Sequence, residues 1–291
     1  MNLNTYLRNK YGMKLYKLSV NAGFTCPNRD GTKGYGGCIF CSGSGSGDFA
    51  EDPSLSVTEQ LDLAKERIRS KLPKGDIGYI AYFQAFTNTY APVERLRSLY
   101  TEAAAYPQVK IVSVATRPDC LPDDVLDLLS EINEEKPVWV ELGLQTIHEK
   151  SARYIRRGYP LNVFDEAVRN LKDRGIETIV HVILGLPGET KEEMLETVRY
   201  VGESGVQGIK LQLLHVLEGT DLAKEYRAGS FSCMTLDEYA DLIGECLTIL
   251  PEDMVIHRMT GDGAKKILVA PEWSKDKKKV MNRLKLISGL Y

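Results

Sequence analysis

The segment Cys26-Pro-Asn-Arg-Asp-Gly-Thr-Lys-Gly-Tyr-Gly-Gly-Cys38-Ile-Phe-Cys41 gathers three of the six cysteines of this chain. Iron–sulfur clusters are usually held by four thiolates, and structural zinc sites close around four ligands, often from a second CxxC or an HxxxH pair. No such partner accompanies the segment, because the other cysteines and the four histidines are scattered along the chain. The segment therefore predicts a 4Fe–4S cluster held by Cys26, Cys38 and Cys41, with one iron left open for chemistry.

The residues around these cysteines favour a cluster over an incidental grouping in a flexible loop. The segment contains Gly31, Gly34, Gly36 and Gly37. Glycine has no Cβ, so its backbone can wrap closely around an inorganic cluster and donate N–H groups to the sulfurs. Phe40, directly before the last cysteine, would shield one face of the cluster from water.

The composition of the 291-residue chain is that of an ordinary soluble protein, with 43% hydrophobic residues and a net charge of −3. This charge excludes a global attraction to nucleic acid or to acidic membranes. No apolar run approaches the roughly 20 residues that span a bilayer, and the polar N-terminus has no signal-peptide core. We therefore expect a cytoplasmic location, no membrane partner and reduced cysteines.

Two local groups of cations could still contact an acidic partner. The stretch 274–285 is rich in lysine, and a second group comprises Arg153, Arg156 and Arg157. The lysine-rich stretch is equally consistent with the solvated face of a terminal helix.

Strand-like and helix-like patterns alternate along the chain. Apolar, β-branched runs predict strands at 14–20, 77–83, 109–115, 138–142, 178–184, 208–213 and 254–257. Helical patterns lie between them at 57–71, 93–105, 122–134, 162–174, 189–204 and 236–250. Ser56 with Glu59 and Thr190 with Glu193 have the spacing of capping boxes. The alternation predicts an α/β fold with a parallel sheet, either open or curled into a full or partial barrel, and a ligand at the C-terminal ends of the strands.

No linker rich in Ser, Gly or Pro divides the chain. The low-complexity piece 43–47 directly follows the cysteine segment and does not separate two domains. We expect an N-terminal extension at 1–13, a core at 14–260 and a basic C-terminal appendage at 261–291.

The segments 19–31, 82–90 and 115–120, together with the cysteine segment, resemble the radical S-adenosylmethionine (radical SAM) superfamily. Most members space their cysteines as CxxxCxxC, whereas the interval between Cys26 and Cys38 is much longer here. The longer interval is similar to that of YhcC/YtqA-type proteins, which are related to the radical SAM domain of the Elongator catalytic subunit. The resemblance covers roughly residues 14–260 and implies a partial (β/α)6-type TIM barrel with a short N-terminal extension and a C-terminal helical appendage.

The resemblance also implies the cofactors. S-adenosylmethionine would chelate the open iron, and one electron from the 4Fe–4S cluster would cleave it to methionine and a 5′-deoxyadenosyl radical. A reductant such as flavodoxin or ferredoxin would supply that electron.

Several cofactor-binding residues follow from the same resemblance. Gln145 stands where relatives contact the ribose, and Arg157 where they pair with the cofactor carboxylate, although Arg157 could also be a surface helix charge. His181 could point into the barrel or be a hydrogen-bonded core residue. Glu141 is open to a structural or a cofactor role.

The sequence departs from the family pattern at two positions. The usual Gly-Gly-Glu after the second strand is absent, so Gln84, or else Thr87 or Asn88, would bind the methionine amine. Relatives often carry an acidic residue where this chain has Ala115, and Ser113 or Thr116 could substitute for it.

Substrate contacts are predicted from polar residues near the ends of the last strands. Lys210 and Gln212 share one face of an apolar strand, where burial is costly without a polar ligand. His215 follows them, and Arg258 lies at the end of the last predicted strand. Cys120, Cys233 and Cys246 are expected to be core or surface residues, since their spacing lacks the signature of a second cluster.

The resemblance points to tRNA as the substrate, with the C5 side chain of wobble uridine converted from carboxymethylaminomethyl toward aminomethyl. Tyr154, Tyr159 and Trp273 could be exposed aromatics that stack on an anticodon loop. No acetyltransferase-like segment accompanies the chain, so the full Elongator reaction does not transfer. The alternatives are a radical SAM enzyme acting on a small metabolite or porphyrin, and a non-enzymatic electron carrier or RNA-binding module.

Overall fold

The computed structural model describes residues 1–45, 47, 50–73, 75, 77–261, 263 and 265–288. Parts of two segments singled out above, 43–47 and the C-terminal appendage 261–291, therefore lie outside the described residues.

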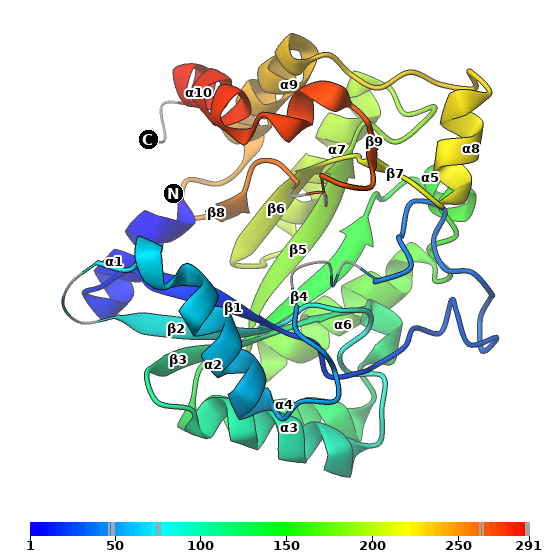
Figure 1. Ribbon diagram of the computed structural model, residues 1–291. Coiled ribbons are helices and arrows are strands. Elements are labelled where there is room, and N and C mark those ends of the chain that lie inside the picture. The colour runs from blue at the N-terminus through cyan, green and yellow to red at the C-terminus, as the bar shows by residue number, and fades with distance from the viewer. Residues whose placement is uncertain are drawn as a thin grey trace.

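In the described part of the chain, a seven-stranded parallel sheet runs in the order β1-β2-β3-β4-β5-β6-β8 and curls into a partial barrel (Figure 1). The strands are β1 (Leu15–Val20), β2 (Gly78–Phe83), β3 (Val109–Thr116), β4 (Val138–Gln145), β5 (Glu177–Leu184), β6 (Gly208–Leu213) and β8 (Val255–Arg258). A small antiparallel pair joins β7 (Val216–Leu217) to β9 (Leu268–Ala270). The predicted parallel α/β fold is confirmed, and each of the seven predicted strands has a counterpart in the sheet.

Helices surround the sheet, and several of them pack on its outer face (Figure 1). They are α1 (Leu3–Tyr11), α2 (Val57–Ile68), α3 (Val93–Ala105), α4 (Asp123–Glu135), α5 (Glu149–Tyr154), α6 (Leu161–Asp173), α7 (Lys191–Glu203), α8 (Asp221–Arg227), α9 (Leu236–Ile249) and α10 (Lys277–Ser288), with short 3-10 turns η1 (Arg69–Lys71), η2 (Pro118–Cys120) and η3 (Glu272–Lys275). Both predicted capping boxes are present, at the starts of α2 and α7. None of the described helices is long and apolar enough to cross a lipid bilayer.

The inside of the barrel is built in layers, because alternate residues of each strand point inward. The bottom layer is apolar and packs on Leu7 of α1; its strand residues are Leu15, Ile80, Ile111, Trp139 and Ile179. Two residues further along each strand lies a polar layer, which we call the polar floor; it comprises Lys17, Tyr82, Ser113, Glu141, His181 and Lys210. Barrel interiors are usually filled by branched apolar side chains at every level, so this layer marks where a site begins.

Candidate active site

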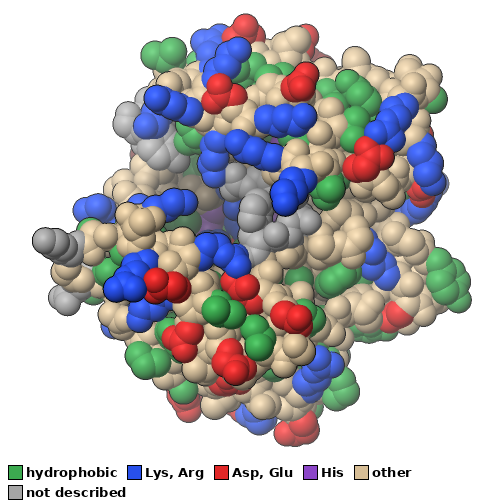
Figure 2. Space-filling model, in the orientation of Figure 1, with side chains coloured by type: hydrophobic (Ala, Val, Ile, Leu, Met, Phe, Trp, Pro, Cys, Tyr) green, Lys and Arg blue, Asp and Glu red, His purple; other side chains and the backbone are tan. Residues whose placement is uncertain are grey.

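The three cysteines of the quoted segment lie at the mouth of the barrel, after the C-terminal end of β1. Cys26, Cys38 and Cys41 line one cavity, whose lower wall includes Glu141 and Lys210 of the polar floor. Figure 2 shows a hollow on this face of the molecule with Lys and Arg side chains around it. The predicted placement of the cysteines above the strand ends is therefore confirmed.

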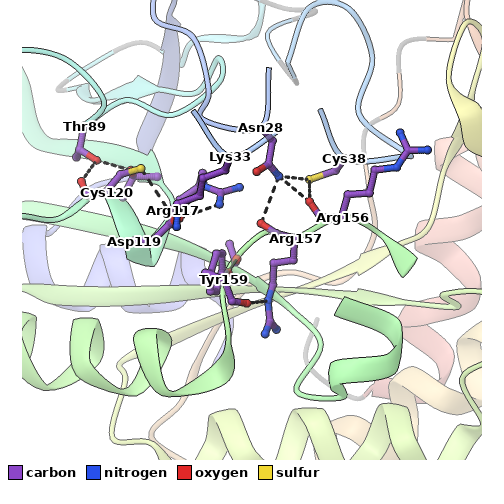
Figure 3. A network of polar contacts seen from close by, with 12 residues as sticks. Asn28, Lys33, Cys38, Thr89, Arg117, Asp119, Cys120, Arg156, Arg157 and Tyr159 are labelled. Carbon is purple, nitrogen blue, oxygen red and sulfur yellow. Dashed lines mark hydrogen bonds and ion pairs between the residues drawn. The ribbon is translucent and has the colours of Figure 1, made fainter. Parts of the chain in front are cut away.

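The long interval between Cys26 and Cys38 is fastened to the segment that follows α5 (Figure 3). The Asn28 amide nitrogen donates to the carbonyl oxygens of Arg156 (2.6 Å) and Arg157 (3.3 Å), and lies 3.5 Å from the Cys38 sulfur. Gly158 has a φ of +83°, and a Cβ there would come within 2.6 Å of the Asn28 Oδ1. The long interval thus supplies a side chain that positions one cluster ligand.

A second set of contacts holds the other end of the segment. The Arg29 guanidinium donates to the carbonyl oxygens of Ser42 (2.6 Å) and Cys41 (3.2 Å). Lys33 forms an ion pair with Asp119, which also receives two hydrogen bonds from Arg117 (Figure 3). The segment is therefore tied both to its own end and to the turn after β3.

The cysteines fit an iron–sulfur cluster better than a single metal ion. Among the described residues, no three His, Cys, Asp or Glu side chains converge as the ligands of one ion would. In a four-iron cluster each thiolate binds a different iron, so the sulfurs stand further apart than around one zinc. Burial raises the pKa of the Cys38 thiol to about 11, and bound iron would have to displace that proton.

Gln145, which lies beside the cysteines, has two energetically unfavourable features. Its φ of +70° is unusual for a residue with a Cβ, and it follows an irregularity in the pairing of β4 with β5. Its Oε1 is buried without a hydrogen-bond partner, while the side chain lines the cavity. Such strain costs about 1–3 kcal/mol and persists where a site requires it, and an unpaired buried oxygen calls for a donor from a ligand. These observations fit a cofactor hydroxyl at Gln145.

Arg157 is not the surface helix charge that the sequence allowed. The residue is only 2% exposed and follows α5 in an irregular segment. Its guanidinium donates to Tyr159 O (3.0 Å), Thr146 O (2.5 Å), Leu144 O (3.4 Å) and the Glu149 carboxylate (3.1 Å). Arg157 lines the cavity, but most of its donors already hold the chain together. Its pairing with a cofactor carboxylate remains a prediction.

The structure separates the alternatives at the two positions that depart from the family pattern. Gln84 lines the cavity and accepts a hydrogen bond from Ser19 (3.2 Å). Thr87 also lines it, whereas Asn88 is buried behind it and donates to Ala115 O (2.8 Å). Thr116 faces the cavity, but the Ser113 hydroxyl donates to Glu141 (2.9 Å) and belongs to the polar floor. Gln84, Thr87 and Thr116 are therefore better placed than Asn88 and Ser113.

The polar floor is organised around the buried carboxylate of Glu141. It accepts hydrogen bonds from Lys17 (2.9 Å), Ser113 (2.9 Å) and His181 (2.8 Å), and from Lys210. Although burial alone would raise the pKa of Glu141, Lys17, Lys210 and His181 hold it well below its usual value. Burial and the charge of Lys210 lower the pKa of His181 to about 4, so this imidazole is neutral at pH 7.

The predicted substrate residues all line the same cavity as the cysteines. They are Lys210, Gln212, His215 and Arg258, joined by His181 and, near the cluster ligands, by Phe40. Sequence reasoning missed Lys17 and Tyr82 of the polar floor. A lysine within the apolar strand β1 was the available signal for Lys17, as it was for Lys210 in β6.

The expectation that Tyr154, Tyr159 and Trp273 are exposed aromatic residues is wrong. Tyr159 is buried, because its ring packs against the guanidinium groups of Arg117 (5.2 Å) and Arg157 (4.7 Å). Tyr154 and Trp273 are half-buried and hydrogen-bonded to Glu225 and to Met234 O, respectively. Cys120 and Cys246 are buried and Cys233 is half-buried, in line with their expected structural roles.

Comparison with known families identifies the chain. The model of the Radical SAM superfamily matches residues 23–201, which include the three cysteines, and the model of the Radical_SAM C-terminal domain matches residues 206–286. The chain belongs to the radical SAM superfamily. It is therefore an enzyme that uses a 4Fe–4S cluster and S-adenosylmethionine.

Individual radical SAM relatives confirm the subgroup that the sequence indicated. The chain is 46% identical over 282 residues to the uncharacterized protein YtqA of Bacillus subtilis (strain 168), covering 97% of this chain and 87% of YtqA. The similarity to the YhcC/YtqA type is thus confirmed. A tRNA uridine(34) acetyltransferase of Methanocaldococcus jannaschii is 24% identical over 152 residues, which cover 51% of this chain and 28% of that protein.

The fold has a counterpart of known structure. Archaeal Elp3 from Methanocaldococcus infernus superposes with a TM-score of 0.66 at 17% identity, covering 94% of this chain and 63% of that one. At this identity the match shows a shared fold and nothing finer.

Proposed function

We propose that this radical SAM enzyme modifies the C5 side chain of wobble uridine in tRNA, converting carboxymethylaminomethyl toward aminomethyl. The observation that carries the proposal is the partial similarity to a tRNA uridine(34) acetyltransferase. The cavity composition supports it: the lining includes Arg29, Arg117, Arg157, Lys210 and Arg258, whereas Glu141 is the one carboxylate among its described residues. A cationic cavity suits a polyanionic substrate.

In this proposal each group of residues in the cavity has a separate role. Cys26, Cys38 and Cys41 would hold the 4Fe–4S cluster, and Asn28 would orient Cys38 through its amide. S-adenosylmethionine bound at the cluster supplies the radical that abstracts hydrogen from carbon. Gln145 would accept a hydrogen bond from the ribose, and the polar floor would face the substrate. A reductant such as flavodoxin or ferredoxin would be the electron source.

The role of Gln145 can be separated from its structural strain. We expect both Gln145→Ala and Gln145→Gly to weaken binding of S-adenosylmethionine about five-fold, because each loses a hydrogen bond worth about 1 kcal/mol. Glycine alone should also raise the free energy of unfolding relative to alanine, since it adopts a positive φ without strain. Equilibrium dialysis of the cluster-loaded protein and urea unfolding measure the two effects. Unchanged cofactor affinity in both variants would show that Gln145 does not contact the cofactor.

The tRNA substrate is tested first in the cell. In a deletion strain, mass spectrometry of tRNA nucleosides should show accumulated carboxymethylaminomethyluridine and loss of the aminomethyl derivative. An unchanged profile would reject the tRNA proposal and favour a small-metabolite substrate.

Binding of tRNA should also depend on the basic start of α10. Lys277, Lys278 and Lys279 are exposed there. Two arginines of the basic groups, Arg283 and Arg156, form ion pairs with Asp237 (2.7 Å) and Asp221 (2.7 Å) and are left unchanged in this test. Replacing the three lysines with glutamine should weaken tRNA binding and flatten its salt dependence, because fewer counterions are released.

The matched control for this experiment carries three other lysine-to-glutamine changes. Lys14, Lys71 and Lys110 are exposed at the opposite end of the barrel, where the first three strands begin. Filter binding over a range of salt concentrations should leave this control indistinguishable from wild type. An equal loss in both triple variants would show that α10 holds no specific phosphate contact.

A further inference from the structure

The polar floor carries more positive charge than its carboxylate balances. Lys17 and Lys210 both contact Glu141, and His181 is neutral at pH 7. Lys210 is 2% exposed and Glu141 is fully buried, so water does little to screen these charges. Burying an uncompensated ammonium costs several kcal/mol, which a bound anion would offset.

The arrangement of donors shows where such an anion would lie. The Lys210 ammonium has three N–H groups, and its contacts within the chain go to Glu141 and to the Tyr82 hydroxyl (3.1 Å). One N–H is therefore left for a ligand. Gln212 lies two residues further along β6, on the same face and nearer the mouth, and lines the cavity as Lys210 does.

The surroundings of Lys210 also favour an anion beside its ammonium group. Burial lowers its pKa well below the usual value, and Lys17 and Arg258 lower it further, while Glu141 only partly opposes them. An anion bound at this point would act in the same direction as Glu141 and favour the ammonium form of Lys210.

We propose that Lys210, supported by Lys17 and Gln212, binds a carboxylate group of the substrate at the polar floor. One ammonium N–H and one amide suit the two oxygens of a carboxylate, whereas a phosphate is usually held by more donors, such as an arginine fork or several backbone N–H groups. The inference rests on the proposed function insofar as a carboxymethylaminomethyl side chain ends in a carboxylate.

A small probe tests the site without tRNA. N-methylglycine carries the same amine and carboxylate as the end of that side chain, and N-methylglycinamide is its counterpart without the carboxylate charge. In anaerobic equilibrium dialysis of the cluster-loaded protein with S-adenosylmethionine, we expect radiolabelled N-methylglycine to bind. Unlabelled N-methylglycine should compete at least ten-fold better than the amide.

Substitutions in the polar floor test whether this layer causes the preference for N-methylglycine over the amide. Lys210→Met should abolish the difference between acid and amide, and Lys210→Arg should retain part of it because the charge remains. Lys17→Met provides a second test from a different strand. The control is Lys191→Met, which removes a surface lysine that is also paired with a carboxylate, at 2.7 Å from Glu245. This control should leave the discrimination unchanged.

Two outcomes would overturn the carboxylate site: equal or absent binding of acid and amide by the wild type, and stronger competition by inorganic phosphate than by N-methylglycine. Failure of the proposed function is distinguishable from both. An unchanged tRNA profile in the deletion strain would remove wobble uridine as the substrate, yet the preference for acid over amide would still hold for another carboxylate.

Discussion

Replacing Cys26, Cys38 or Cys41 with alanine is expected to abolish the 4Fe–4S cluster and, with it, cleavage of S-adenosylmethionine. Three protein thiolates already leave one iron open, so the loss of another leaves too few ligands to retain the cluster. All three cysteines line the same cavity, and none is fully exposed. Iron and sulfide analysis after anaerobic reconstitution measures the loss directly.

Cys120→Ala and Cys233→Ala are the matched controls for this experiment. Cys120 is buried near the turn after β3, and Cys233 is half-buried between α8 and α9. Both single variants should retain the iron and sulfide content of the wild type. Full cluster content after replacement of all three cluster cysteines would contradict the ligand assignment.

The sheet could be predicted from sequence because its strands are buried on both faces. β2 is buried at every position, and β3 at all but one, so both are visible as continuous apolar runs. The helix α1 was not predicted, since its sequence is largely polar with Leu7 as its buried residue. It is held by packing beneath the barrel and by the bridge between Asn2 and Ile256. Such long-range pairing leaves no local signal.

Site residues could be predicted where the residue type alone indicates the chemistry. They were harder to predict where burial and contacts depend on neighbouring parts of the fold. The cysteine ligands follow from spacing, and Lys210 from its position within an apolar strand. The burial of Arg157 and Tyr159 was not predicted, because it depends on backbone carbonyl groups of β4 and of the turn after it. The strain at Gln145 likewise depends on a backbone irregularity that its side chain does not reveal.

Glu141→Gln is expected to cause the largest loss of stability among substitutions outside the cluster ligands. The change keeps the shape of the side chain but leaves Lys17 and Lys210 without their carboxylate. Breaking a buried ion pair by removing one partner typically costs about 3–5 kcal/mol. Urea unfolding followed by circular dichroism should show this loss as a lower midpoint. Glu131→Gln is the control, because its partner Arg97 is exposed and ion pairs on the surface add little to stability.

A double variant shows whether the loss arises from the unpaired lysine. In Glu141→Gln/Lys210→Met the buried ammonium is removed together with its carboxylate, so part of the stability should return relative to Glu141→Gln alone. The coupling between the two positions should be large, because their charged groups are in direct contact. Additive losses would contradict this, since they would mean that Glu141 stabilises the barrel through Lys17, Ser113 and His181 independently of Lys210. A loss in Glu141→Gln no greater than in Glu131→Gln would show that the buried carboxylate is not ionised in the folded protein.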